Sequence, residues 1–247
     1  MLRNLFMTIC CAVVSGAAAS AGPIGEMQRL GKIEIDRTEV TVGQFRRYVT
    51  STGAVTSAER AGGGLVYEGG WTKKKGWTWS SPFGVSATDK EPAVHVTFDE
   101  AQAYCRWAGK RLPTDGEWTS AAYREQRISP PPPFRRGARY PYPTGASPAG
   151  AHCLGDCGSR RGGEHGDVLA RGSGHVAAGT AAAGVNGLYD MGANVWEWVD
   201  SGDGDARITR GGSWWYGAEQ MREDHVASKP RDMAVVYIGF RCVCDAD

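Results

Sequence analysis

The chain of 247 residues carries 28 Lys and Arg against 27 Asp and Glu, a formal net charge of +1. A charge this close to zero gives no indication of a nucleic acid or an anionic membrane surface as partner. Only 41% of the residues are apolar, whereas 35 glycines and 9 tryptophans are high counts. This composition is typical of large aromatic side chains packed between turn-rich backbone segments.

The N-terminus has the pattern of a secretory signal peptide. A basic start at Arg3 precedes an apolar run from Leu5 to Ala18, and Ala19-Ser20-Ala21 is an A-x-A cleavage site. The run is shorter than the roughly 20 residues of a membrane span, which disfavours the alternative of an uncleaved anchor. We therefore expect a signal peptide at residues 1–21, a single mature domain at 22–247, and a secreted or periplasmic protein without stable membrane insertion.

Three short helices are predicted by the same N-terminal signature. Capping boxes, in which a Thr is followed three residues later by Glu or Gln, occur at Thr41–Gln44, Thr97–Glu100 and Thr114–Glu117. After Thr97, apolar residues recur at the spacing of one helical face, and this face includes Cys105. We therefore expect Cys105 to be buried.

The strands are brief and the connections are long. Alternating patterns predict strands at Lys32–Asp36 and at Tyr237–Val243, and Arg207–Arg210 is a third candidate. Gly62–Gly84 and the Pro-rich Ser129–Gly150 are expected to be loops within one domain.

Five cysteines remain after cleavage of the signal peptide. An exported chain enters an oxidising compartment, so at least one disulfide is expected, and the odd number leaves one thiol over. Cys153-x-x-x-Cys157 either closes a tight loop or binds a metal, and the disulfide is favoured because zinc-like spacing is missing nearby. The five are Cys105, Cys153, Cys157, Cys242 and Cys244.

Two further groups are open to more than one interpretation. Trp71, Trp77 and Trp79, with Lys73–Lys75, either line a ligand site or cover the core. Metal binding in the Gly-rich stretch before the Asn186 block has weak support from spacing, and a surface loop is favoured there. The residues concerned are Glu164, His165, Asp167 and His175.

Six ordered blocks resemble the formylglycine-generating, sulfatase-modifying-factor family. The resemblance implies an α+β domain with an irregular C-type-lectin-like fold and little regular secondary structure. A single block would be weak, but the order of all six is that of the family. The blocks are Ile35–Thr41, Glu91–Thr97, Ala103–Trp118, Asn186–Trp198, Arg210–Trp214 and Ile238–Cys242.

The resemblance also implies a disulfide and a calcium site. Family members pair the cysteine of the Ala-Tyr-Cys-x-Trp helix with the one after Gly-Phe-Arg, which here are Cys105 and Cys242. Two carboxylates and two backbone carbonyls in the Asn186–Trp198 block suit a hard cation that takes six to eight oxygens. In the alternative, the carboxylates only satisfy local backbone N–H groups. The calcium ligands would be Asp190, Ala193, Val195 and Glu197.

The chain departs from the family at its best-known chemistry. In active members two cysteines after the Gly-Gly-Ser bind copper, and soft thiolates are the ligands that select Cu(I). The matching positions here are Tyr216 and Met221. The segment instead places carboxylates and a histidine beside an aromatic wall that would bind the substrate. These side chains suit acid–base catalysis or the binding of a redox metal of unknown identity. The alternative is a solvated charged face. Candidate catalytic residues are Tyr216, Glu219, Asp224 and His225, and candidate substrate-binding residues are Trp214, Trp215, Met221 and Arg222.

These observations predict an exported, divergent enzyme of oxidase type that modifies a peptide or peptide-derived substrate without dithiolate copper. The alternative is a non-catalytic, lectin-like binding or accessory protein for a polypeptide or glycan. Formylglycine generation on sulfatases is the least favoured of the three. The sequence names neither the substrate nor the oligomeric state.

Overall fold

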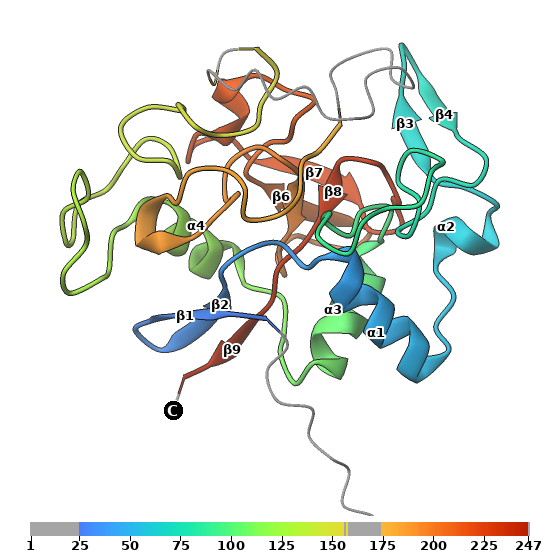
Figure 1. Ribbon diagram of the computed structural model, residues 1–247, viewed down its shortest axis with the longest axis horizontal. Helices are drawn as coiled ribbons and strands as arrows, with labels where there is room; N and C mark the ends of the chain where they lie inside the picture. The colour runs from blue at the N-terminus through green and yellow to red at the C-terminus, as the bar shows by residue number, and fades with distance from the viewer. Residues whose placement is uncertain (1–24, 156, 158–173, 247) are drawn as a thin grey trace, which may run out of the picture.

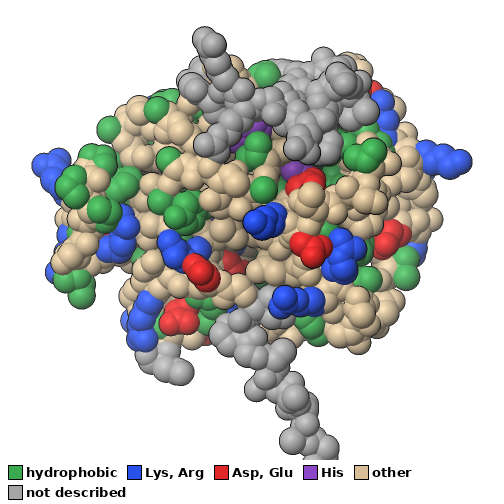
Figure 2. Space-filling view, in the orientation of Figure 1, with side chains coloured by type: hydrophobic (Ala, Val, Ile, Leu, Met, Phe, Trp, Pro, Cys, Tyr) green, Lys and Arg blue, Asp and Glu red, His purple; other side chains and the backbone are tan. Residues whose placement is uncertain are grey.

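A computed structural model describes residues 25–155, 157 and 174–246 (Figure 1). The predicted signal peptide and Glu164, His165 and Asp167 lie outside the described residues. No helix in the described ranges is both long and apolar enough to cross a bilayer. Lys and Arg side chains are interspersed with Asp and Glu on the face shown in Figure 2, as the near-zero net charge suggests.

The helices are short, and four of them have a threonine as N-cap. The helices are α1 (Val42–Thr52), α2 (Ser57–Arg60), α3 (Phe98–Trp107) and α4 (Asp115–Tyr123), with 3-10 turns η2 (Val185–Gly187) and η3 (Ala218–Met221). The three predicted capping boxes are confirmed, each with reciprocal bonds between the threonine and the residue three positions later. A fourth capping box, Thr56–Glu59, was not predicted, because it begins a single-turn helix with little periodicity.

The strands form three small sheets. β1 (Met27–Leu30), β2 (Ile33–Asp36) and β9 (Val243–Asp245) pair antiparallel, and β3 (Leu65–Tyr67) pairs with β4 (Trp71–Lys73). The central sheet has the order β7 (Ala227–Pro230), β6 (Ala206–Arg210), β5 (Trp196–Trp198) and β8 (Ile238–Gly239). Figure 1 shows the termini of the fold together at the β1–β2–β9 sheet.

Two predictions about regular structure were wrong. Tyr237–Val243 is not one strand, because the chain leaves the central sheet after Gly239 and joins β2 at Val243. Between these strands the Phe240 carbonyl accepts from Val40 N–H and the Asp36 carboxylate accepts from Cys242 N–H. Gly62–Gly84 is not wholly loop, since it contains the β3–β4 hairpin. In Ser129–Gly150, as predicted, there is neither a helix nor a strand.

An aromatic core joins the helices to the central sheet. Phe45 of α1 stacks on Tyr104 of α3 at 5.7 Å between ring centroids, and Phe240 meets both rings edge-on. Trp77 and Trp79 are buried in this core, whereas Trp71 is exposed. Trp77 and Trp79 therefore cover the core, whereas contact of Trp71 with a ligand stays a prediction.

Both predicted disulfides are present. Cys105 pairs with Cys242 across 137 positions, and Cys153 pairs with Cys157. Among the described residues Cys244 is the one free cysteine, and its Sγ lies 3.9 Å from Met27 Sδ. The first bridge ties α3 to the segment between β8 and β9, which is where the chain changes sheets.

Candidate functional site

The Gly-Gly-Ser turn positions the segment that follows β6. Gly211 has φ 94°, and a Cβ there would lie 2.7 Å from the Met191 carbonyl oxygen, so only glycine fits. Arg210 forms a two-point ion pair with Asp115 of α4 and donates to the carbonyls of Glu223 and His225. This arginine therefore fastens the end of the segment to α4.

Several predicted substrate-binding residues belong to the core. Trp214 and Trp215 are buried in the main aromatic cluster, and Met221 is 0% exposed. The Met221 carbonyl accepts from Tyr123 Oη at 2.8 Å. A substrate would not reach these three side chains directly in this conformation. Arg222, by contrast, is exposed and forms an ion pair with Asp224 at 3.2 Å.

Tyr216 and His225 come together around Trp196. The ring centroid of Trp196 lies 5.9 Å from that of Tyr216 and 5.7 Å from that of His225. Tyr237, which the sequence analysis did not single out, hydrogen-bonds to Tyr216 with ring centroids 6.0 Å apart. Burial, and then the Tyr216 neighbour, raise the pKa of Tyr237. We call these four residues the Trp196 cluster.

Lys229 of β7 adds a cation to the Trp196 cluster. Its Nζ lies 5.8 Å from the Trp196 ring centroid, and its burial lowers the pKa of the ammonium. Burial lowers the pKa of His225 as well, and the Lys229 charge contributes in the same direction. A histidine held neutral in this way is able to accept a proton. Glu219 and Asp224 are exposed and do not enter the ring stack.

The β3–β4 hairpin extends the aromatic surface outward. Tyr67 and Trp71 are 43% and 49% exposed, with ring centroids 5.3 Å apart. Trp71 also lies 6.5 Å from Tyr237 of the Trp196 cluster. Aromatic side chains thus run from an exposed hairpin to the half-buried His225.

The predicted calcium ligands lie in a buried ionic cluster. Both carboxylate oxygens of Glu197 accept from Arg241, at 2.7 and 2.8 Å, and Trp118 Nε1 donates to one of them at 2.7 Å. Glu197 therefore has little capacity left for a cation. Asp190 accepts from Gly179 N–H through one oxygen, while its Oδ1 is buried without a hydrogen-bond donor.

Glu39 is the cluster member that sequence reasoning missed. Its Oε1 accepts from Asn194 at 2.9 Å, its Oε2 is buried without a donor, and it lies within hydrogen-bonding reach of Asp190. Burial, and then the Asp190 charge, raise the pKa of Glu39. Asp190 and Glu39 thus offer a hard cation two spare carboxylate oxygens, so Glu39 fits in place of Glu197.

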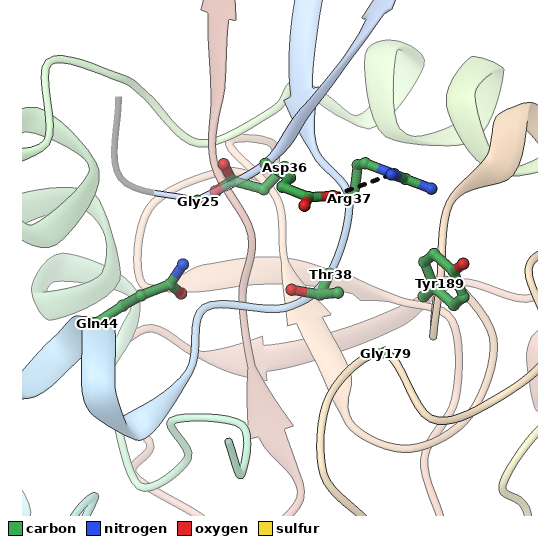
Figure 3. A pocket seen from close by; sticks show the side chains of 8 residues that line it. Gly25, Asp36, Arg37, Thr38, Gln44, Gly179 and Tyr189 are labelled. Atoms are coloured by element: carbon green, nitrogen blue, oxygen red, sulfur yellow. Dashed lines mark hydrogen bonds and ion pairs between the residues drawn. The ribbon is translucent and has the colours of Figure 1, made fainter. Parts of the chain in front are cut away.

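Figure 3 shows a cavity of about 240 Å³ that is lined by residues adjacent in the chain to this pair. Thr38 and Tyr189, the chain neighbours of Glu39 and Asp190, line it together with Gly179, and Glu26 pairs with Arg37 at its rim. Among the described residues, no three His, Cys, Asp or Glu side chains are grouped so that they could hold a metal ion.

His175 does not lie in a surface loop as favoured from the sequence. It is 2% exposed, and its Nε2 lies 3.1 Å from Glu91 Oε2. Burial opposes ionisation of Glu91, but hydrogen bonds from His175 and Thr88 lower its pKa to about 2. The pair joins the residues before α3 to the segment that leads into the Asn186 block.

The architecture defines an irregular α+β protein of the C-type-lectin-like class. Consistent with this, the structure of PvdO from Pseudomonas aeruginosa matches with a TM-score of 0.59 and 20% identity, covering 87% of this chain and 80% of that one. The chain belongs to the family defined by the sulfatase-modifying factor enzyme 1-like domain, whose model matches residues 13–246.

Curated relatives in this family carry different names. A formylglycine-generating enzyme of Thermomonospora curvata is 32% identical over 91% of this chain and 85% of its own length. An inactive C-alpha-formylglycine-generating enzyme 2 of Bos taurus is 30% identical over 91% and 81%. A hercynine oxygenase of Mycolicibacterium thermoresistibile is 29% identical, and the match covers 86% of this chain and 51% of the relative.

Proposed function

We propose that this chain is an exported enzyme of oxidase type that modifies a peptide or peptide-derived substrate without dithiolate copper. The Trp196 cluster carries the proposal, because Tyr216 occupies the position of a copper cysteine in the family resemblance and contacts the same Trp196 ring as His225. His225, with its lowered pKa, acts as proton acceptor, and the Tyr216–Tyr237 pair orients the substrate. The names of the relatives, formylglycine-generating enzyme and hercynine oxygenase, support oxidative chemistry.

The exposed aromatic residues of the hairpin support a peptide as substrate. Tyr67 and Trp71 provide flat apolar contact area beside the Trp196 cluster. Acidic and basic side chains at the exposed end of the segment, among them Glu219, Arg222 and Asp224, provide polar contacts. The negative charges of Asp224 and Glu219 favour the protonated form of His225, since both raise its pKa.

A test of the proposal combines oxygen uptake with mass spectrometry. Protein exported through its own signal peptide is incubated with a peptide library prepared from periplasmic extract. We expect a substrate-dependent mass change with oxygen consumption, and we expect His225→Gln to reduce the rate by roughly 10²–10⁴-fold at unchanged melting temperature. Glu219→Gln is the matched control at an exposed carboxylate and should change the rate less than tenfold.

The second candidate function is a non-catalytic binding protein. It is favoured by the buried Met221 and by an inactive enzyme among the relatives. Peptide retention that depends on Trp71 and Tyr216 but occurs without oxygen uptake or mass change would establish this alternative. Aldehyde formation on a Cys-x-Pro-x-Arg peptide would instead establish formylglycine generation.

We also propose a structural calcium ion held by Asp190 and Glu39 with the carbonyl oxygens of Ala193 and Val195. Calcium at 100 times its dissociation constant should stabilise the EDTA-treated protein by about 2.7 kcal/mol, measured as a rise in melting temperature. Asp190→Asn and Glu39→Gln should each reduce this response, and magnesium should not reproduce it. The site would be ruled out if the EDTA-treated protein takes up no calcium on dialysis against calcium and its melting temperature does not change.

A further inference from the structure

Lys229 of β7 is a half-buried cation that has no carboxylate partner among the described residues. Its Nζ lies 5.8 Å from the centroid of the Trp196 ring. Burial lowers the pKa of the ammonium, and no described carboxylate counteracts this effect. Arg210 of the neighbouring strand, by contrast, pairs with Asp115 of α4. The three N–H donors of Lys229 are therefore available to a ligand.

The central sheet does not account for this cation. β7 is an edge strand, where an exposed lysine commonly discourages pairing with another chain. Lys229 lies against Trp196 instead, and the residue opposite it on β6 is Arg207. Directly opposite side chains share one face of an antiparallel pair, and two like charges in this arrangement are destabilising. The sheet thus contains an unfavourable pair of cations, which a bound anion would relieve.

The chemistry around the cation pair favours a carboxylate as this anion. Arg207 already has acceptors, because its guanidinium donates to three carbonyls of the adjacent loop and lies 4.9 Å from the Phe98 ring centroid. Asp224, in the segment after β6, pairs with Arg222 rather than with Lys229. The ammonium of Lys229 therefore matches the single negative charge of a carboxylate better than the roughly double charge of a phosphate.

The ammonium lies beside the aromatic surface that was described above. The Trp196 ring that it contacts also contacts Tyr216 and His225. Trp71 of the β3–β4 hairpin packs on the same cluster and is exposed. Aromatic side chains beside a charge exclude water, and the lower local dielectric strengthens a charge-assisted hydrogen bond. A peptide that lies along this surface would therefore bring an acidic group to Lys229 at a favourable place.

We propose that Lys229 binds a carboxylate of the substrate, so that the protein selects peptides with an acidic side chain or a free C-terminus at this point. The ammonium donates to the carboxylate oxygens, and the face of the Trp196 ring holds the cation in position. The inference rests on the proposed function in taking the substrate to be a peptide. It is tested by binding under nitrogen, which does not require turnover.

The experiment measures which peptides the immobilised full-length mature protein retains. The probes are pools of N-acetylated hexapeptides that contain either Asp and Glu or Asn and Gln, and that end in either a carboxylate or an amide. We expect the wild type to retain roughly tenfold more or above of a pool with carboxylates than of the pool without any, as for one hydrogen bond to a charged group. The pool that is enriched shows whether a side chain or the C-terminus supplies the carboxylate.

Three substitutions separate the charge of Lys229 from its packing. Lys229→Met keeps most of the side-chain length and should retain all pools equally at an unchanged melting temperature. Lys229→Arg restores the charge and should restore the preference for carboxylates. Lys32→Met, at an exposed lysine between β1 and β2, is the matched control for net charge and should leave the preference as in the wild type.

Equal retention of all pools by the wild type, retention of none, or a preference that survives in Lys229→Met would overturn the inference. Carboxylate-selective binding that depends on Lys229, without oxidation of any peptide, would support the inference and refute the proposed enzyme. Oxidation of acidic and amidated peptides at equal rates would support the enzyme and refute the inference.

Discussion

Replacing Arg241 with methionine is expected to lower the free energy of unfolding by about 3–5 kcal/mol, the cost of leaving one partner of a buried ion pair unpaired. Arg241 is fully buried and makes two bonds to Glu197. It also donates to the carbonyls of Asp36 and Tyr189. Its loss would leave Glu197 without its cation beside Glu39 and Asp190, in a site where all three carboxylates are buried.

Urea unfolding followed by tryptophan fluorescence measures this loss. Arg231→Met is the matched control, because Arg231 pairs with Asp99 at the surface and such pairs contribute about 0–1 kcal/mol. Adding Glu197→Gln to Arg241→Met should restore part of the stability, since it removes the unpaired charge. A loss below 1 kcal/mol for Arg241→Met alone would show that the buried ionic cluster does not depend on this guanidinium.

Removing the Cys105–Cys242 bridge with two alanines is expected to cost about 5 kcal/mol in the chain-entropy model, because the closed loop spans 137 positions. Both cysteines are fully buried, so the alanines also leave a small cavity that adds to the loss. The bridge holds α3 against the segment between β8 and β9, in which the chain passes from the central sheet to β2. Without the bridge, the unfolded chain gains conformational entropy, and this gain accounts for most of the expected loss of stability.

The Cys153–Cys157 bridge supplies the comparison. It closes a loop of four positions, for which the same model gives about 2 kcal/mol. Denaturant unfolding of both double variants under non-reducing conditions should therefore rank the long bridge above the short one. An equal loss in the two variants would mean that strain or residual structure, rather than loop length, governs these disulfides.

Sequence patterns predicted the elements that depend on neighbours in the chain. The capping boxes at Thr41, Thr97 and Thr114 involve residues three positions apart, so each was visible without knowledge of the fold. The pairing of Cys105 with Cys242 came from the family resemblance and is confirmed. The prediction of one strand at Tyr237–Val243 was wrong, because an alternating apolar pattern does not show that the chain passes from one sheet to another.

At the candidate site, the sequence located the segment but not its internal arrangement. Tyr216 and His225 meet around Trp196, as grouping them implied, whereas Met221 points into a buried cluster. Tyr237, Lys229 and Glu39 were missed because their partners lie in other parts of the chain. No local pattern marks a tyrosine that meets another across 21 positions, or a glutamate that meets Asp190 across 151.

The sequence by itself determined the family, the helix starts and the absence of the two copper cysteines, since each depends on residue identity or short spacing. Only the tertiary structure decided that Arg241 hydrogen-bonds to both carboxylate oxygens of Glu197, that Glu39 faces Asp190, and that Met221 contacts Cys157. These contacts join distant segments, and their existence depends on how the whole chain packs. Burial then gives them their chemistry, because charges and sulfurs removed from water interact with the neighbours that the fold provides.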